Sequence, residues 1–133
     1  MSTDETSALV HEFWQRMASN QFELVEPLLS DEFVLEWPQS LERLRGAANF
    51  TRMNREYPAN GVWQFTVHRV VGGLDEAVSD VSITDGVACA RAITFFSMVD
   101  GRITRITEFW PEPYDAPQNR AHLVESMAAS DQG

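Results

Sequence analysis

The sequence predicts an α+β fold in which three N-terminal helices are wrapped by a curved, mainly antiparallel mixed β-sheet. Apolar residues recur at three- and four-residue spacing in the first part of the chain, but after Gly61 they alternate with polar residues. Short turns rich in Asp and Gly separate the later runs, which favours strands that pair in sequential order. Such a sheet leaves one concave face, where we expect a site.

The first helix is expected to begin at a cap supplied by Thr6 or Ser7 and to end near residues 19–20. Its apolar stripe consists of Leu9, Val10, Phe13, Trp14 and Met17. A second, short helix is predicted over residues 22–29, because its apolar positions keep a helical spacing. Residues 30–31 are expected to end it.

A short strand is predicted over residues 33–37, because Pro38 cannot continue a strand that needs its backbone N–H. The residues from there to Gly46 are expected to form a loop. A third helix is predicted from residue 47 to about residue 57. Its apolar side carries Phe50 and Met53.

Four strands of a meander are predicted over residues 62–71, 76–84, 87–98 and 102–110. Residues 1–133 are expected to form a single domain, with a proline-rich tail at 111–133. We expect this tail to fold over the sheet, with a short helix at 118–129 and Tyr114 as a lid on the pocket.

The composition excludes several functions. The chain of 133 residues has a formal net charge of -10, with ten Arg and no Lys. Because no lysine is present, Schiff-base chemistry and a lysine general base are excluded. An acidic chain without a basic cluster disfavours nucleic acid and anionic membranes as partners. No apolar stretch reaches the length of a membrane span.

Metal and thiol chemistry are also disfavoured by spacing. His11, His68 and His122 have no ligand-type partner nearby in the sequence, so we expect no metal site. The single Cys89 fits a reducing, cytoplasmic setting and is interpreted as a small buried apolar residue. His68 remains a conditional acid or base on the first long strand.

Two registers are open for the last hairpin. If residues 100–101 form a two-residue type I′ turn, Glu108 lies opposite Ile93. Arg91 then pairs with Asp80 and reaches Glu108, so Arg91 is a conditional site residue.

If Gly101 is instead a bulge after a type I turn, Glu108 lies opposite Ala92. Arg91 would then face outwards or into a dimer contact. We favour this register because it places small side chains beneath the helices. The inward residues would be Ala90, Ala92, Thr94, Phe96 and Met98.

One prediction holds in both registers, provided that the turns at 85–86 and 100–101 are of the same type. A change of turn type then shifts the register of both hairpins by one residue, and the two shifts cancel between the first and the last of the three strands. The residues predicted to share one face are Asp80, Ser82, Ile106, Glu108 and Trp110. Burial raises the pKa of a carboxyl and makes it useful as an acid or base near neutral pH. We therefore predict Glu108 as the catalytic acid or base and Asp80 as its helper.

Two segments carry a resemblance to a known family: Asp100-Gly101-Arg102-Ile103 and, after it, Glu108-Phe109-Trp110-Pro111. With the order of elements over most of residues 7–125, they resemble the SnoaL-like branch of the nuclear transport factor two-like superfamily, whose relatives include polyketide cyclases, ketosteroid isomerase and limonene epoxide hydrolase. The resemblance implies a conical fold with a deep pocket between helices and sheet. It also implies a homodimer formed through the outer sheet face.

The relatives' catalytic residues are matched only in part. Glu108 stands where the limonene epoxide hydrolase relatives have an aspartate on the last strand, and Asp80 matches their second aspartate. Val78 stands where they have an arginine. In the context Thr107-Glu108-Phe109, Glu108 resembles the glutamate of the phenazine-pathway relatives.

Relatives resembling ketosteroid isomerase carry a tyrosine on the first helix, an aspartate base after the first strand and an acidic donor on the penultimate strand. The matching positions here are Phe13, Trp37 and Thr94, so that acidic pair is missing.

The aromatic and apolar residues near the expected pocket predict a small apolar ligand. The proposed ligand-binding residues are Phe13, Met17, Trp37, Phe50, Met53, Tyr57, Thr94, Phe96, Ile106 and Trp110. The first hypothesis is a cofactor-independent isomerase, cyclase, dehydratase or hydrolase. The alternative is a non-catalytic ligand-binding or dimeric interaction module.

Overall fold

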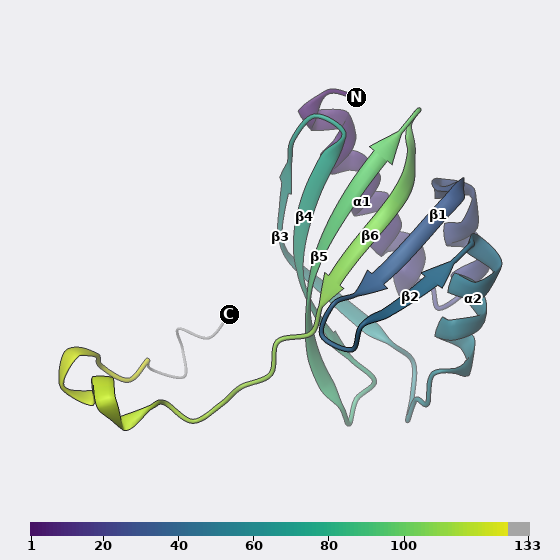
Figure 1. The fold of residues 1–133 in the computed structure, drawn as a ribbon. Helices are drawn as coiled ribbons and strands as arrows, with labels where there is room; N and C mark the ends of the chain where they lie inside the picture. The colour runs from purple at the N-terminus through teal and green to yellow at the C-terminus, as the bar shows by residue number, and fades with distance from the viewer. Residues whose placement is uncertain (128–133) are drawn as a thin grey trace.

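The computed structural model describes residues 1–127, in which helices lie in the hollow of a six-stranded sheet (Figure 1). The helices are α1 (Thr3–Ala18), α2 (Ala47–Glu56) and the 3-10 segments η1 (Phe22–Leu28) and η2 (Gln118–Leu123). The strands are β1 (Leu29–Trp37), β2 (Glu42–Arg45), β3 (Gln64–Gly72), β4 (Glu76–Thr84), β5 (Cys89–Val99) and β6 (Arg102–Phe109). The predicted α+β class is confirmed. No helix among residues 1–127 is long and apolar enough to cross a membrane.

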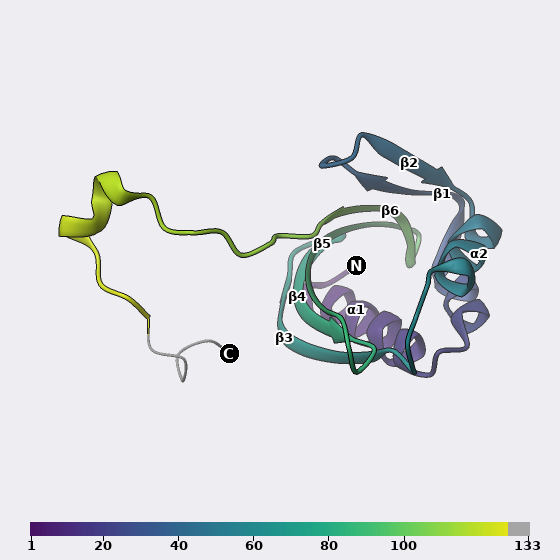
Figure 2. The ribbon, with the colours of Figure 1, turned by 90° about the horizontal axis from the view of Figure 1, so that it is seen from below.

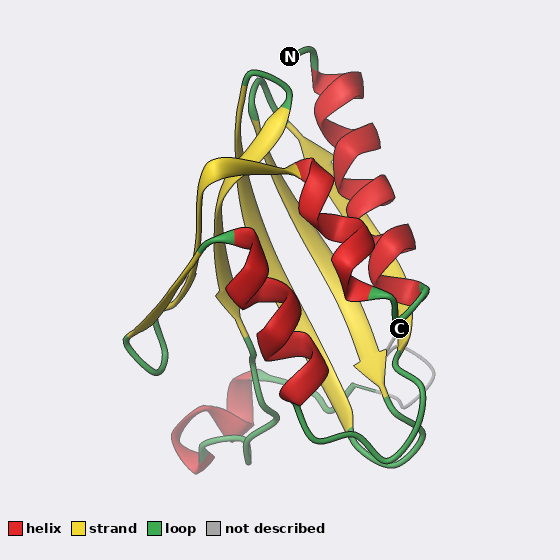
Figure 3. Ribbon diagram, turned by 90° about the vertical axis from the view of Figure 1, so that its right-hand side faces the viewer, coloured by secondary structure: helices red, strands yellow, loops and turns green. Residues whose placement is uncertain are grey.

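The sheet has the order β2-β1-β6-β5-β4-β3 and is mixed, because β1 and β6 run parallel. All its other neighbouring strands are antiparallel. The sheet curls around α1, and α2 and η1 lie beside β1 on the same concave side (Figures 2 and 3). The helices and the concave face enclose the core, whose largest fully buried side chains include Phe13, Phe33, Phe96, Ile103 and Ile106.

Helix α1 begins at Thr3, earlier than the predicted cap at Thr6 or Ser7. Ser2 Oγ accepts a hydrogen bond from the Glu5 backbone N–H at 3.1 Å, and the Glu5 carboxylate accepts one from Ser2 N at 3.0 Å. This reciprocal pair is a capping box. Thr6 is buried within the first turn and donates its hydroxyl to Ser2 O, so the acidic start of the chain is part of the helix.

Strand β2 was predicted as a loop. Its sequence, Glu42-Arg43-Leu44-Arg45, has one apolar residue and little pattern of its own. It forms by antiparallel pairing with β1, where Trp37 lies opposite Glu42. Strand β1 itself starts at Leu29 rather than Phe33, because its first part already lies beside β6. The formation of β2 and the start of β1 therefore depend on pairing with a neighbouring strand.

The last hairpin follows neither predicted register. Asp100 and Gly101 both have positive φ, +52° and +77°, as a type I′ turn requires, and Val99 pairs with Arg102. A bulge within β6 then shifts the pairing by one residue. Glu108 therefore lies opposite Thr94, and not opposite Ile93 or Ala92.

The prediction that Asp80 and Glu108 share a face is wrong. Asp80 pairs with Ile93, while Glu108 pairs with the adjacent Thr94, so their side chains leave opposite faces of the sheet. The two turns differ in length, since Thr84 pairs with Cys89 around a four-residue loop. The assumed cancellation of the two slips therefore does not occur.

The tail leaves the sheet and runs away from the body of the protein (Figures 1 and 2). Every residue from 111 to 127 is exposed. Tyr114 is 79% exposed and does not line the cavity described below, so it is not a lid. The predicted helix over 118–129 is a 3-10 segment over Gln118–Leu123, and residues 128–129 lie outside the described residues.

Candidate functional site

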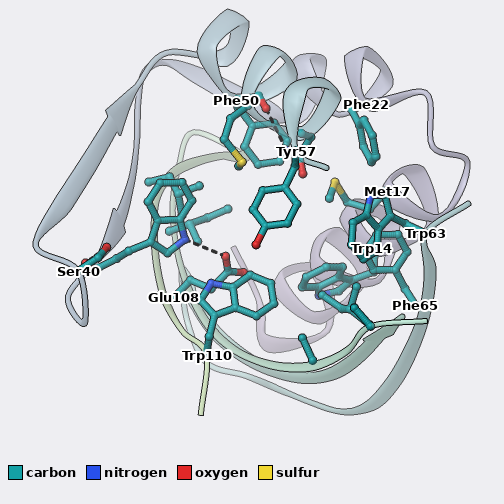
Figure 4. A pocket seen from close by; sticks show the side chains of 18 of the residues that line it. Trp14, Met17, Phe22, Ser40, Phe50, Tyr57, Trp63, Phe65, Glu108 and Trp110 are labelled. Carbon is teal, nitrogen blue, oxygen red and sulfur yellow. Dashed lines mark hydrogen bonds between the residues drawn. The ribbon is translucent and has the colours of Figure 1, made fainter. Parts of the chain in front are cut away.

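A cavity of about 760 Å³ lies between the helices and the concave face of the sheet (Figure 4). Its volume is within the range of small-molecule sites, roughly 300–1,000 Å³. All four tryptophans of the chain contribute to its wall. The aromatic lining residues are Phe13, Trp14, Phe22, Trp37, Phe50, Tyr57, Trp63, Phe65 and Trp110.

Glu108 is the buried carboxyl of this cavity. It projects from β6 and is 9% exposed. One carboxylate oxygen accepts a hydrogen bond from Trp37 Nε1 at 3.2 Å, and the other accepts one from Thr94 Oγ1 at 2.8 Å. The two donors come from β1 and β5, the strands on either side of β6. The parallel β1–β6 contact and the bulge in β6 therefore assemble this cluster.

Burial raises the pKa of Glu108 above its ordinary value of 4.5, because desolvation penalises the charged form. The hydrogen bonds from Thr94 and Trp37 act in the opposite direction, since they stabilise the carboxylate. Both donors are uncharged, so they return only part of the solvation that the carboxylate loses. Glu108 can therefore exchange a proton closer to neutral pH than an exposed glutamate.

Adjacent residues on β1 explain why Trp37 rather than Glu36 reaches the cavity. Strand side chains alternate between faces. Glu36 consequently lies on the other face, where it pairs with Arg43 and Arg105. These two arginines hold the pKa of Glu36 below its ordinary value. Glu36 therefore cannot supply to the cavity the acid that is missing at position 37.

Most of the predicted ligand-binding residues lie in the cavity wall. Those that line it are Phe13, Met17, Trp37, Phe50, Met53, Tyr57, Ile106 and Trp110. Thr94 and Phe96 do not line it, because both are fully buried behind the wall. Thr94 contributes through its hydrogen bond to Glu108.

Asp80 and Arg91 lie outside the cavity on the convex face. Arg91 Nη2 donates to Asp80 Oδ2 at 2.8 Å, and this pairing lowers the pKa of Asp80. Arg91 therefore pairs with Asp80, as the type I′ alternative predicted, but does not reach Glu108. His68 is exposed and contacts Ser82 at 2.6 Å, also away from the cavity.

Sequence reasoning missed several wall residues. Trp14 was assigned to the helical core stripe, yet it also borders the cavity while its Nε1 donates to the buried Ser79 at 3.0 Å. Trp63 and Phe65 alternate with polar residues in the sequence, which could have indicated that they face the same way. Cys89 was interpreted as buried, but it is exposed. It is the first residue of β5 and directly follows the β4–β5 loop.

Asp85 is a structural carboxylate that sequence reasoning also missed. It accepts hydrogen bonds from the backbone N–H groups of Asn60, Val87 and Ala88 at 2.8, 3.0 and 2.7 Å. These bonds lower its pKa from 3.8 to about 2. Asp85 thereby joins the β4–β5 loop to the segment before β3, and both border the cavity. Among residues 1–127, no group of three or more His, Cys, Asp or Glu side chains is arranged to hold a metal ion.

Comparisons with known proteins give one family and several similar folds. A family model described as a SnoaL-like domain matches residues 10–106. A solved structure from Kribbella flavida DSM 17836, provisionally described as a ketosteroid isomerase, is 37% identical to this chain. It has a TM-score of 0.87 and covers 96% of this chain and 93% of that one. No curated protein matches the chain significantly.

Two more distant structures share the fold. An NTF-2-like protein of unknown function from Burkholderia xenovorans LB400 is 22% identical, with a TM-score of 0.78 over 94% of this chain and 97% of that one. An LEH-like epoxide hydrolase from M. tuberculosis is 20% identical, with a TM-score of 0.67 over 82% of this chain and 84% of that one.

Proposed function

The chain belongs to the SnoaL-like domain family, and we propose that it is a cofactor-independent acid–base enzyme acting on an apolar metabolite. Glu108 is the proposed acid and base. The observation that carries the proposal is a carboxyl at the wall of an aromatic cavity whose pKa is raised by burial. Such a group can both donate and accept a proton near neutral pH.

The reaction class we favour is proton transfer at carbon, as in an isomerisation. The Glu108 carboxylate removes a proton from a carbon next to a carbonyl, so that a C–H bond breaks as an O–H bond forms. The proton then returns to another carbon of the same substrate. The Tyr57 hydroxyl points into the cavity towards Glu108 (Figure 4) and is the proposed hydrogen-bond donor to the substrate oxygen that gains negative charge.

Hydrolysis has less support. The resemblance to epoxide hydrolases implied a second carboxylate and an arginine in the pocket. Asp80 and Arg91, the candidates for a carboxylate and a cation beside Glu108, pair with each other on the convex face. The cavity-lining residues among the described chain include no guanidinium to orient a hydrolytic water or a leaving oxygen. Isomerisation needs one carboxyl that moves a proton between two carbons, and Glu108 can serve in that role.

Isomerisation of 3-cyclohexenone to 2-cyclohexenone, followed by ultraviolet absorbance, tests the role of Glu108. The wild-type protein is expected to accelerate this proton transfer. Glu108→Gln preserves the size of the side chain and is expected to lower the rate by about 10²-fold or more, the scale of general acid–base catalysis. Glu12→Gln, on the exposed side of α1, is the matched control. An unchanged rate in Glu108→Gln would overturn the assignment.

A specific observation favours ligand binding without chemistry as the second candidate. The resemblance matched Trp37 and Thr94 to acidic catalytic positions, but here both donate hydrogen bonds to Glu108. A carbon-13 NMR titration of Glu108 separates the two functions. A pKa at the ordinary value, combined with tight ligand binding and no turnover, would favour a binding protein.

We also propose that the protein forms a homodimer through the convex face of the sheet. Val71 pairs with Val78, and Val78 pairs with Phe95, so these three side chains form one row across that face. Phe95 is 47% exposed although it packs edge-on against Phe109 at 6.2 Å. Covering this row with a second copy would remove apolar surface from water.

A further inference from the structure

The charged residues that line the cavity are all acidic. Among the described residues they are Glu42, Glu108 and Glu112. The other titratable groups in the wall are Tyr57 and Cys89, which are neutral or negative in every protonation state. No arginine or histidine of the described chain lines the cavity. A carboxylate or phosphate ligand would therefore meet no opposite charge there.

Glu108 has the hydrogen-bond partners of a carboxylate but lacks a cation in the cavity. Trp37 and Thr94 donate to its two oxygens, and both donors are neutral. Desolvation consequently raises the pKa of Glu108 and shifts its equilibrium towards the protonated form. A ligand cation would supply the charge that the lining residues do not, and a charge pair is stronger in a dry site than at the surface.

Aromatic side chains surround the space in front of Glu108. Trp110 lies beside the carboxyl, and Tyr57 extends across the middle of the cavity towards it (Figure 4). Trp37 adds a third aromatic side chain, held by its hydrogen bond to Glu108. Aromatic faces attract ammonium groups through their quadrupoles, most strongly for tryptophan. A carboxylate next to such faces is complementary to an organic cation.

We propose that the cavity binds a protonated amine that carries an apolar ring or chain, with the ammonium between Glu108 and the neighbouring aromatic side chains. This inference names the ligand class of the site described above, and it rests on the proposed function in using Glu108 as the proton-exchanging group. The volume of about 760 Å³ leaves room for an apolar body against Phe13, Phe50 and Met53.

The proton balance of binding depends on the protonation states of the Glu108 carboxyl and of the ligand amine before they bind. When an ammonium binds to protonated Glu108, the O–H bond breaks and one proton leaves to solvent. When the free amine binds instead, Glu108 transfers its proton to nitrogen, so an N–H bond forms as the O–H bond breaks. Both routes end in the same ion pair. Amine affinity should therefore fall as the pH drops below the pKa of Glu108.

Isothermal titration calorimetry with 2-phenylethylamine, 2-phenylethanol and phenylacetate tests this selectivity, because the three probes share one ring. The amine is expected to bind at least tenfold more tightly than the alcohol, and phenylacetate more weakly than either. Titrations in buffers of different ionisation enthalpy should show release of up to one proton per amine below the pKa of Glu108. Equal or tighter binding of the alcohol would overturn the inference.

Glu108→Gln should abolish the preference for the amine while keeping the affinity for the alcohol, and Glu12→Gln should keep both. If Glu108→Gln fails to fold, Trp110→Leu provides a second test at the partly exposed mouth. It should reduce amine binding several-fold more than alcohol binding. Retained amine preference in a folded Glu108→Gln variant contradicts the proposal. Loss of cyclohexenone turnover without any amine preference would sustain the proposed function and reject only this inference.

Discussion

At the scale of residues, the site depends on one carboxyl and the groups that bury it. Glu108 receives Trp37 from β1 and Thr94 from β5, and both positions were singled out by resemblance to acidic residues of relatives. In this protein Trp37 and Thr94 are not acids themselves, and they donate hydrogen bonds to Glu108. The same two donors oppose the effect of burial on the pKa of Glu108 without reversing it.

The raised pKa of Glu108 predicts a dependence of stability on pH. Between the ordinary value of 4.5 and the raised pKa, the folded state binds more protons than the unfolded state, so stability falls as the pH rises. Glu108→Gln removes this titration. Urea unfolding should therefore show Glu108→Gln gaining stability relative to wild type between pH 4 and pH 8. A difference that is constant between these pH values would contradict the raised pKa.

At the scale of elements, the bulge in β6 decides where Glu108 points. The hairpin starts with the pairing of Val99 and Arg102, and without the bulge Glu108 would lie opposite Ile93 on the convex face. One extra residue in a strand moves every later side chain to the other face. The tight turn therefore sets the register at the start of the hairpin, and the bulge sets the register at Glu108.

The turn at Asp100–Gly101 gives a prediction for this element. Gly101 has φ of +77°, and a Cβ there would contact nothing within 4 Å, so a substitution meets backbone strain without a clash. Gly101→Ala should reduce the free energy of unfolding by roughly 1–2 kcal/mol, measured by urea unfolding. Gly101→Asn should lose less, because asparagine tolerates this conformation. Equal losses in both variants would show that the conformation is not the cause.

At the scale of the whole molecule, the helices fill only part of the hollow of the curled sheet. Helix α1 packs on β3 and β4, and α2 packs on β1 and η1. Residues of both groups, among them Phe13 of α1 and Phe50 of α2, line the cavity. Figure 3 shows the two groups of helices side by side in the hollow of the sheet. The convex face carries no helix among the described residues, and the tail runs away from it (Figure 2). This arrangement leaves the cavity on the concave side of the sheet and an uncovered convex face on the other side.

The proposed dimer gives a prediction at this scale. Phe95→Asp places a charge in the apolar row of the convex face and should shift the protein from dimer to monomer in light scattering. Leu24→Asp is the matched control, because Leu24 is 44% exposed on η1, away from that face. A wild-type protein that is monomeric at micromolar concentration, or a Phe95→Asp variant that remains dimeric, would exclude this interface.

The sequence by itself determined the fold class, the meander and part of the cavity wall. Periodicity reports which side of an element is apolar, and an α1 stripe with Phe13 and Met17 can only face inwards. Short Asp-Gly turns likewise identify neighbouring strands. Glu108 was predicted from the face that the strand pairing gives it and from the effect of burial on a carboxyl, and the resemblance of its segment to the last strand of relatives supported it.

Only the tertiary structure decided which carboxyl shares the cavity with which partners. Register depends on turn length and on bulges, and a slip of one residue moves a side chain across the sheet, so Asp80 lies outside and Glu108 inside. The pairing of β2 with β1 and of β1 with β6 joins segments far apart in sequence. Those contacts place Trp37 on Glu108, and no local pattern along the chain encodes them.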